Sequence, residues 1–386
     1  MINSFDIAVV GGGPAGSMSA LNACRDGVSV CLIERKNEFG IPVRCGEGIG
    51  KKGLMRYVEP HQEWIKATVK RSMMVSPSGI KVQLANVEES FILDREKMDA
   101  DLVRMAEKAG TRIFSGTTVL SVKQNADKTY MLVTTDVSIT AKIVIIADGV
   151  ESKIARCLGW NTKLDLKDLE TSAFARVVSP FIDKESCVFY TGSAVAPGGY
   201  AWVFPRGNGE ANVGLAISGD HSNPGFARKL LDKFIEHEFP AARVYNYHCG
   251  GVPVGKWLKP LSKDGVMIVG DAARQVNALS GGGISFSLFA GKLAGSVASK
   301  AINNGNVNYT VLDEYERTWK KKFGKQQERS YKLKEFLAKN GSDAFLDRIA
   351  RSLSKENPEK INYLRVFLKT FAKHPVLLYK AFQLFR

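Results

Sequence analysis

The sequence predicts an α/β fold with three parts: a discontinuous parallel-sheet domain, a mainly antiparallel β-sheet domain, and a helical C-terminal region. Three observations support this prediction. An apolar, strand-like run at the N-terminus leads through a glycine-rich turn into a helix. Residues 171–253 form short strand-like runs separated by Gly, Pro and Asn, whereas the chain beyond Asn308 is helical in pattern. Strands alternating with helices favour a parallel sheet, and clustered short strands favour an antiparallel one.

The N-terminal unit has the form of a dinucleotide-binding strand, turn and helix. Residues 5–10 are an apolar strand, and residues 14–25 have helical spacing of apolar side chains. Between them, Gly11, Gly13 and Gly16 carry the G-x-G-x-x-G spacing. The first glycine permits the tight turn, the second lets backbone N–H groups approach a pyrophosphate, and the third lets the helix lie close to the sheet. The helix N-terminus adds unpaired N–H groups and a partial positive charge.

A second strand, residues 28–33, ends on Glu34, which lies 18 residues after Gly16. At this distance a carboxylate can accept hydrogen bonds from both ribose hydroxyls, and it would repel a 2′-phosphate. The unit therefore suits the adenosine half of FAD or NAD. Arg35 follows directly and is a further candidate cofactor contact.

The composition excludes several classes of protein. The chain has 386 residues, of which 45% are hydrophobic and 24% are charged, as in an ordinary globular protein of about two domains. Six cysteines show neither C-x-x-C pairs nor zinc spacing, so no metal site and no disulfide framework are expected. The N-terminus lacks the basic and apolar regions of a signal peptide. The longest apolar run, residues 284–302, is interrupted by Lys292 and small residues, which favours a core helix over a membrane span.

Two further segments are candidates for cofactor contact. The run Arg44-Cys45-Gly46-Glu47-Gly48 packs charged and reactive side chains among glycines. We expect it to pass close to the cofactor, although a flexible surface loop has the same composition. A helix is predicted from Asp94, a suitable N-cap, to Ala109. Arg95 in its first turn either reaches a cofactor phosphate or is an ordinary solvated arginine.

Two later strand ends carry similar chemistry. The apolar strand 142–146 ends on Ala147-Asp148-Gly149, a turn that can lie near the pyrophosphate. The strand 265–270 leads into Asp271, and the glycine-rich run 281–283 then opens the helix that begins near Ile284. This helix start again offers N–H groups and a positive dipole end.

These elements predict the domain boundaries. The parallel-sheet, cofactor-binding domain comprises residues 1–68, 94–165 and 255–310. The β-sheet substrate domain comprises 69–93, an antiparallel excursion, and 166–254. Residues 311–386 form a basic helical region.

Taken together, the three glycine and Asp-Gly motifs resemble the FAD-containing group of the p-hydroxybenzoate hydroxylase fold. The resemblance implies FAD as the cofactor, with Asp271 contacting the ribityl-side hydroxyls and the helix start at Gly283 facing the flavin pyrimidine. The implied FAD contacts, by matching position, are Ala15, Glu34, Cys45, Gly46, Gly48, Arg95, Val119, Asp271, Gly283 and Ile284.

A narrower resemblance covers nearly the whole chain. Residues 197–205 fit P-x-x-Y-x-W-x-F-P, and together with the loop at Cys45 they are similar to the geranylgeranyl reductase family. That resemblance implies an FAD-dependent reductase that saturates C=C bonds in the geranylgeranyl chains of archaeal ether phospholipids. It also implies a cytoplasmic-side enzyme of membrane lipid biosynthesis.

The aromatic motif has two interpretations. Side chains alternate along a strand, so Tyr200, Trp202 and Phe204 point to one face and form a flat apolar wall. The wall is either a surface for a hydrocarbon substrate or packing between two layers. Arg206, just beyond it, is a candidate contact for a lipid phosphate. Cys45 and Tyr200 are candidate proton donors, and either could equally be structural.

The net charge of +15 is concentrated at the C-terminus. Residues 320–386 contain 17 Lys/Arg and 6 Asp/Glu, which accounts for +11 of the total. Residues Ile361, Leu364, Phe367, Leu368 and Phe371 fall on one face of a basic helix, which either lies on an anionic membrane or packs on its own domain. A basic surface also suits an acidic ferredoxin or another small electron donor, and no second glycine motif for NADPH is present.

Three other functions compete with the ether-lipid reductase. A flavin monooxygenase of the same fold would consume O2 and NADPH, and the aromatic motif argues against it. Within the reductase family, the substrate could instead be the prenyl tail of a quinone or pigment. Nucleic-acid or protein binding through the basic tail is a different class of function, and the tail contains no recognised nucleic-acid motif.

Overall fold

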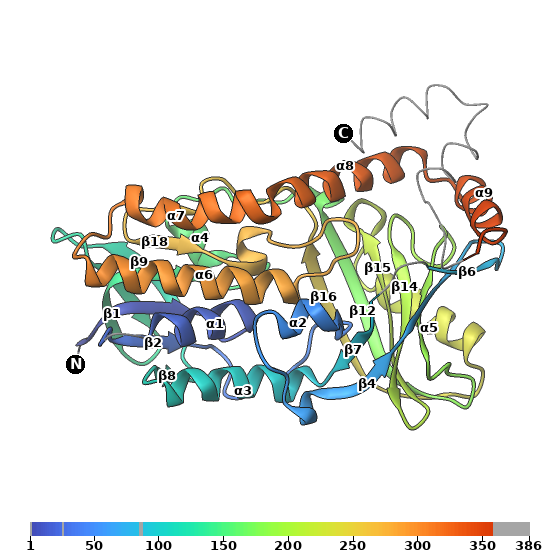
Figure 1. Ribbon diagram of the computed structural model, residues 1–386, viewed down its shortest axis with the longest axis horizontal. Coiled ribbons are helices and arrows are strands. Elements are labelled where there is room, and N and C mark those ends of the chain that lie inside the picture. Colours follow the sequence, from blue (N-terminus) through green and yellow to red (C-terminus); the bar gives the residue numbers. More distant parts are fainter. Residues whose placement is uncertain (1, 25–26, 85–87, 358–386) are drawn as a thin grey trace.

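The computed structural model describes residues 2–24, 27–84 and 88–357. Figure 1 shows two lobes side by side, with the glycine-motif strand β1 in one and the sheet containing β12, β14 and β15 in the other. A line of C-terminal helices runs along both lobes. Within the described residues, no helix is long and apolar enough to span a bilayer.

The first lobe is built on an eight-stranded sheet in the order β17-β18-β11-β1-β2-β8, with β10 and β9 added beside β11. The strands are β1 (Ile2–Val10), β2 (Val30–Ile33), β8 (Arg112–Phe114), β9 (Val119–Gln124), β10 (Tyr130–Thr134), β11 (Ser138–Ile146), β17 (Ser262–Lys263) and β18 (Val266–Ile268). From β18 to β8 the pairs are parallel, with Val10 opposite Ile146 and Ile33. The carboxyl ends of these strands therefore meet at one edge, where ligands bind in open α/β sheets.

Helices pack closely against this sheet because small residues separate them. The helix α1 (Pro14–Ala23) contacts α6 (Ile284–Asn303) along its length. A β-carbon at Gly291 would lie 2.2 Å from the Ala15 carbonyl oxygen, and one at Gly295 would lie 2.3 Å from that of Ser19. Only glycine permits this approach, which sets the start of α6 beside the glycine turn. Asp94 caps α3 (Arg95–Lys108) by accepting from the Lys97 N–H, as predicted.

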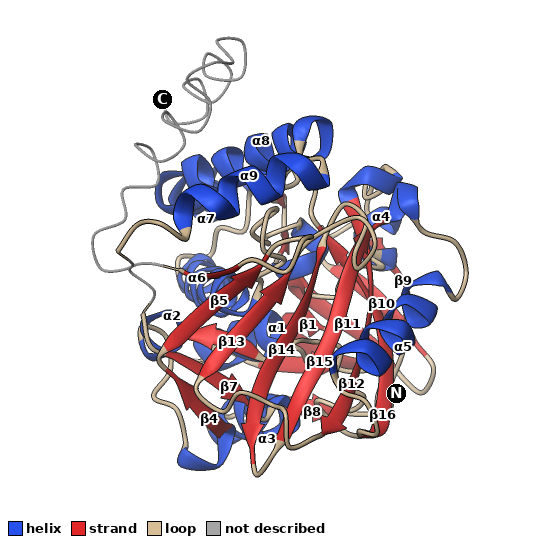
Figure 2. Ribbon diagram, turned by 90° about the vertical axis from the view of Figure 1, so that its right-hand side faces the viewer, coloured by secondary structure: helices blue, strands red, loops and turns tan. Residues whose placement is uncertain are grey.

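The second lobe is a seven-stranded sheet in the order β16-β12-β15-β14-β13-β5-β6, seen in Figure 2. Its strands are β5 (Arg71–Val75), β6 (Lys81–Gln83), β12 (Leu169–Val178), β13 (Ser186–Tyr190), β14 (Tyr200–Gly207), β15 (Glu210–Ser218) and β16 (Arg243–Pro253). All pairs are antiparallel except β5 with β13. The helix α5 (Phe226–Glu238) covers one face over a core that includes Ala173, Val213 and Leu231. The opposite face is turned toward the first lobe.

A three-stranded sheet, β3-β7-β4, joins the lobes. It comprises β3 (Gly48–Gly50), β4 (Ile65–Val69) and β7 (Ser90–Leu93). The predicted antiparallel excursion over 69–93 is therefore only partly right. Its first and last strands belong to this connecting sheet, while β5 and β6 extend the large sheet, because β5 pairs in parallel with β13, 115 residues later. The shorter helices are α2 (Lys51–Met55), α4 (Lys153–Cys157) and the 3₁₀ turns Gln62–Trp64, Leu166–Asp168, Gly219–His221 and Gly270–Ala273.

The C-terminal helices brace both lobes. Helix α7 (Tyr309–Trp319) continues through a π-turn (Lys320–Gly324) into α8 (Lys325–Asn340), and α9 (Asp343–Leu353) follows. The fully buried Trp319 packs against Phe289 of α6. At the other end, the Asp347 carboxylate accepts from the hydroxyls of Ser76 and Ser78 beside β5. The predicted amphipathic helix at 361–371 lies outside the described residues.

Candidate active site

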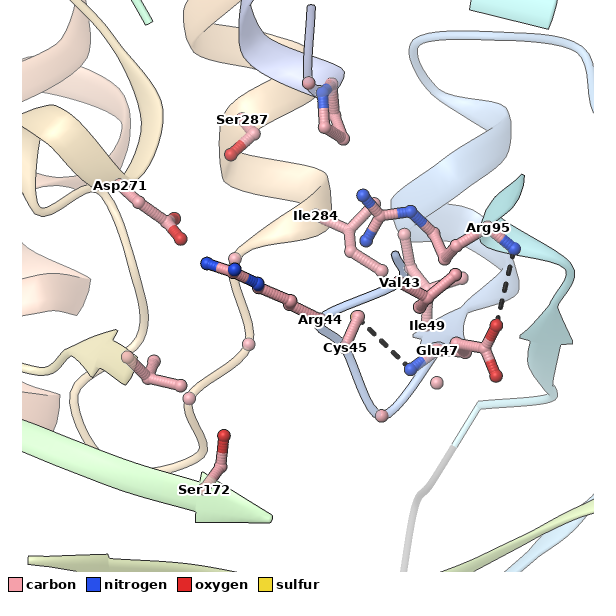
Figure 3. Close-up of a pocket in the computed structure, with 18 of the residues that line it drawn as sticks. Val43, Arg44, Cys45, Glu47, Ile49, Arg95, Ser172, Asp271, Ile284 and Ser287 are labelled. Carbon is pink, nitrogen blue, oxygen red and sulfur yellow. Dashed lines mark hydrogen bonds between the residues drawn. The ribbon is translucent and has the colours of Figure 1, made fainter. Parts of the chain in front are cut away.

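A cavity of about 660 Å³ lies where the two lobes face each other. Its walls come from the glycine turn after β1, the loop before β3, the start of α6, and the inner face of the large sheet. Figure 3 shows part of this lining, with Asp271 on one side, Cys45 and Glu47 on the other, Ile284 above Cys45, and Ser172 of β12 below. Most predicted site residues line it: Gly13, Ala15, Glu34, Arg35, Cys45, Gly46, Gly48, Arg95, Asp148, Tyr200, Trp202, Phe204, Asp271, Gly283 and Ile284.

The glycine turn has the geometry of a phosphate cradle. Gly11 has φ +107°, and a β-carbon there would lie 2.3 Å from the Ala147 carbonyl oxygen. A β-carbon at Gly16 would lie 1.8 Å from the Gly11 carbonyl oxygen. Gly13, in contrast, has open space where its β-carbon would be. Gly11 and Gly16 thus shape the turn from behind, outside the cavity lining, while Gly13 leaves the backbone free to meet a ligand.

Glu34 lies at the end of β2, beside the turn. Its carboxylate accepts from the Gly12 N–H at 2.7 Å and from the Lys36 N–H at 3.0 Å. A carboxylate has about four acceptor positions, so two are left for ribose hydroxyls. Arg35 lies at the rim, half exposed, and pairs with Glu151 at 3.3 Å.

Two partly buried carboxyls, which lack a full set of hydrogen-bond partners among the described residues, fit a polar cofactor. Asp148 Oδ1 is buried and without a hydrogen bond among the described residues, while Oδ2 accepts from the Ile154 N–H at 2.8 Å. Burial raises the pKa of Asp148 to about 6. Burial also raises the pKa of Asp271, against an opposing effect of Arg95, and Asp271 Oδ1 lies 3.4 Å from the β-carbon position of Gly283. The glycine cradle and these two carboxyls fit the phosphates and hydroxyls of FAD.

The loop at Cys45 is anchored by Glu47. The Cys45 thiol accepts from the Glu47 N–H at 3.2 Å, and Glu47 Oε1 accepts from the Arg95 N–H at 3.4 Å (Figure 3). Glu47 has φ +70°, a conformation that costs a non-glycine residue about 1–2 kcal/mol. The Arg95 guanidinium itself is bonded to Asp99 at 2.8 and 2.9 Å. It lines the cavity, and the Asp99 carboxylate, one helical turn away, neutralises its charge.

Glu47 also holds a buried charge cluster between the lobes. Its side chain is 1% exposed, and Oε2 accepts from Arg176 and Arg206 at 2.5 Å each and from Asn212 at 3.1 Å. Arg206 additionally donates to Glu210 at 3.0 Å and is 8% exposed. The prediction that Arg206 meets a lipid phosphate is therefore corrected. Its guanidinium lies outside the cavity lining, and two carboxylates and the Leu93 carbonyl already bind it.

The three predicted rings form one wall of the cavity. Trp202 lies 6.1 Å from Tyr200 and 6.1 Å from Phe204 between ring centroids, and Phe189 of β13 contacts both Tyr200 and Phe204. The loop at Cys45 runs directly over the wall. A β-carbon at Gly46 would lie 3.3 Å from Trp202, and one at Gly48 would lie 3.1 Å from Phe204. The expected common face is confirmed, and the wall is in contact with the loop expected to meet the flavin.

A hydrogen-bond relay ties the wall to that loop. The Trp202 indole N–H donates to Asn212 Oδ1 at 2.9 Å, and Asn212 Nδ2 donates to the Cys45 carbonyl at 3.1 Å. The Tyr200 hydroxyl donates to the Ser280 carbonyl at 2.5 Å, in the turn before α6. Burial raises the pKa of the Cys45 thiol and that of the Tyr200 hydroxyl above their ordinary values. Both groups therefore stay protonated at neutral pH and are weak acids.

One predicted FAD contact lies away from the cavity, and two members of the charge cluster around Glu47 were not predicted as site residues. Val119 begins β9 and packs against the core of the first lobe, outside the cavity lining. Arg176 and Asn212 were not predicted as site residues, although each is a polar side chain within a strongly apolar strand. That pattern is a usable signal, because a buried polar group in a strand needs a partner.

Comparison with known proteins identifies the family. Residues 168–252 match the geranylgeranyl reductase catalytic domain, and residues 6–150 match the FAD dependent oxidoreductase family. The digeranylgeranylglycerophospholipid reductase of Methanocella arvoryzae is 37% identical over 98% of both chains. That of Methanosarcina acetivorans is 38% identical, covering 100% of this chain and 97% of the relative.

The chain belongs to the geranylgeranyl reductase family. Its fold agrees with the crystal structure of a geranylgeranyl bacteriochlorophyll reductase-like protein from Thermoplasma acidophilum, with TM-score 0.90, 33% identity and full coverage of both chains. A flavin-dependent brominase shares only the fold, with TM-score 0.71 at 17% identity. The family is one of FAD-dependent oxidoreductases, so the cofactor and fold class predicted from the sequence are confirmed.

Proposed function

We propose that this protein is an FAD-dependent reductase that saturates C=C bonds in the geranylgeranyl chains of an ether phospholipid, digeranylgeranylglycerophospholipid. The observation that carries the proposal is a single cavity in which an apolar wall of three rings adjoins the residues that fit FAD. Full-length relatives that bear this reductase's name at 37–38% identity support the substrate class.

The chemistry explains why the protein needs such a cavity. Reduced FAD, when bound, supplies a hydride. An isolated trisubstituted alkene has no carbonyl to stabilise a carbanion, so protonation with tertiary-cation character is the favourable polarity. The rings of Tyr200, Trp202 and Phe204 hold the chain in one orientation and keep water away from the reacting carbons. Aromatic faces also stabilise nearby positive charge, which suits the polarity of this reaction.

The test is the lipid composition of cells that make the unsaturated precursor. We expect co-expression of this protein with the precursor pathway to convert geranylgeranyl chains into chains heavier by two hydrogens for each bond reduced, read by mass spectrometry. A variant with Glu34 changed to Ala is the matched control, because it removes a cofactor contact at the far end of the cavity. Unchanged lipid masses with the wild-type protein would refute the proposal.

The prenyl tail of a pigment is the second candidate substrate. It is favoured by one observation, the likeness of this chain to the geranylgeranyl bacteriochlorophyll reductase-like protein of Thermoplasma acidophilum. Purified holoenzyme given both classes of substrate in competition distinguishes them. We expect the phospholipid to be consumed first, and preferential reduction of a geranylgeranylated pigment would reverse the assignment.

We further propose that the protein reaches its lipid substrate by peripheral contact with an anionic membrane. The support is the concentration of positive charge after Lys320, where each basic residue near such a surface adds about 1 kcal/mol. Vesicle flotation of the full chain and of a version ending at Asn357 tests this. Equal binding of the two would refute a role for the last 29 residues.

An acidic ferredoxin-like protein is the proposed electron donor. Burial lowers the pKa of Lys322, and the nearby charges of Arg56 and Lys292 lower it further, so three elements contribute to one basic patch. A patch of this kind speeds association with an acidic partner and loses effect as salt rises. Stopped-flow reduction at low and high ionic strength is the measurement, and a salt-independent rate would contradict the proposal.

A further inference from the structure

Glu170 lies on the cavity face of the large sheet. Side chains alternate along β12, and Ala173 and Ala175 face the core beneath α5. Glu170, Ser172 and Phe174 face the opposite way and line the cavity. A carboxyl side chain at the start of this row is unusual, because it is 5% exposed on the same face of the sheet as the aromatic rings.

The Glu170 carboxyl lies at the end of the cavity where the FAD-fitting turn and the ring wall meet. Its Oε2 lies 3.8 Å from the β-carbon position of Gly281, two residues before Gly283. Ser280, the next residue back, holds the Tyr200 hydroxyl through its carbonyl. Burial raises the pKa of Tyr200, and the charges of Glu170 and Cys45 raise it further, so the three groups are electrostatic neighbours around one end of the ring wall.

The Glu170 carboxyl has surroundings that let it carry a proton, and give it up, near neutral pH. Burial raises the pKa of Glu170 to about 7, opposed by the charge of Lys334 on α8. Among the described residues, no hydrogen bond to its carboxylate contributes to this value. The other titratable groups facing it are Tyr200 of β14 and, beyond that ring, Cys45 in the loop. Both of these have pKa values raised away from neutrality, and the Lys334 ammonium is bonded to Asp168 at 2.6 Å.

We infer that Glu170 is the general acid of the reduction, delivering the proton to the alkene carbon that does not receive the hydride. This inference rests on the proposed function. The carboxyl O–H bond breaks, one alkene carbon gains a C–H bond, and the π bond is lost. The other carbon takes the hydride that the reduced cofactor supplies, so one hydride, which carries both electrons, and one proton complete the saturation. Glu170 is left as a carboxylate and regains its proton from solvent before the next cycle.

The test uses the purified FAD-loaded enzyme and compares E170Q with E335Q. Glu335 is a half-exposed carboxylate on α8, paired with Lys167 away from the cavity. General acids contribute 10²–10⁴-fold, so we expect E170Q to slow flavin reoxidation by lipid by about that factor and E170D to recover part of it. E335Q should react at the wild-type rate.

The pH profile is the readout that a merely structural residue would not change. The acid form is the active one, so the wild-type rate should be constant below pH 6 and fall about tenfold per pH unit above about 7. The charge of Lys334 lowers the pKa of Glu170, so in K334Q the fall in rate should begin at higher pH. The rate of E170Q should not show this fall with pH.

A second readout needs no turnover. Wild type should show an infrared carbonyl band of a buried carboxylic acid that disappears as pH rises through about 7, and E170Q should not show it. The role of Glu170 would be overturned if E170Q were as fast as an active wild-type enzyme. It would also be overturned if the wild-type rate did not fall as pH rises above about 7. If wild-type enzyme itself is not reoxidised by lipid, the proposed function fails instead.

Discussion

Replacing Glu47 by alanine should destabilise the protein more than removal of any surface carboxylate. Oε2 of Glu47 accepts from Arg176 and Arg206 at 2.5 Å each, and all three side chains are at most 10% exposed. Breaking a buried pair by removing one partner costs about 3–5 kcal/mol, because the remaining charge stays desolvated. Here two guanidinium groups remain, and Glu210, 3.0 Å from Arg206 and 4.0 Å from Arg176, neutralises them only partly. We therefore expect a loss of about 3–5 kcal/mol.

Urea unfolding of the FAD-loaded protein, followed by tryptophan fluorescence, measures this loss. Trp202 is a suitable reporter, because its indole is linked through Asn212 to Glu47. The matched control is Glu185→Ala, which removes the exposed partner of Arg71 and should cost no more than about 1 kcal/mol. If the two variants unfold with equal free energy, Glu47 does not organise the interface between the lobes.

Two further substitutions separate the wall from the cofactor site. At Gly214, a β-carbon would lie 2.3 Å from the Trp202 ring. G214A should therefore displace the ring and slow lipid-dependent reoxidation of the flavin at least tenfold while FAD stays bound. The control is G250A, whose β-carbon would have its nearest contact at 3.5 Å and which should leave the rate within twofold. At the other end of the cavity, Glu34→Gln should weaken the hydrogen bonds to the ribose hydroxyls. Because hydrogen bonds to a charged group contribute about 1.5–3 kcal/mol, FAD affinity, measured by flavin fluorescence quenching, should fall about 10- to 100-fold. Glu38→Gln, at an exposed position, should leave the affinity unchanged. Retention of full activity by G214A, or of full affinity by E34Q, would contradict these assignments.

The parts of the site that local physics determines were predictable from the sequence. Gly11, Gly13 and Gly16 lie within one turn, and the contact that Gly16 avoids comes from the Gly11 carbonyl oxygen in that same turn. The common face of Tyr200, Trp202 and Phe204 follows from strand alternation alone. In both cases the relevant atoms are a few residues apart, so periodicity and spacing carry the information.

The charge cluster depends on distant partners and could not be predicted in this way. Glu47 meets Arg176, Arg206 and Asn212 across separations of 129–165 residues. A pattern in one segment identifies a polar residue in an apolar strand but not its partner, and Arg206 was accordingly assigned to a lipid phosphate. Glu170 escaped notice for a simpler reason. The predicted strand-like region began at residue 171, whereas β12 begins at Leu169, and only the longer strand places Glu170 on the cavity face.

The most direct test of the account is anaerobic reoxidation of the reduced flavin by lipid. Holoenzyme reduced with one equivalent of dithionite should be reoxidised when digeranylgeranylglycerophospholipid is added without oxygen, as read from the return of flavin absorbance. The fully saturated lipid should cause no change, because it offers no double bond to accept the hydride. A reduced flavin that stays reduced with the unsaturated lipid, or that responds equally to both lipids, would contradict the account.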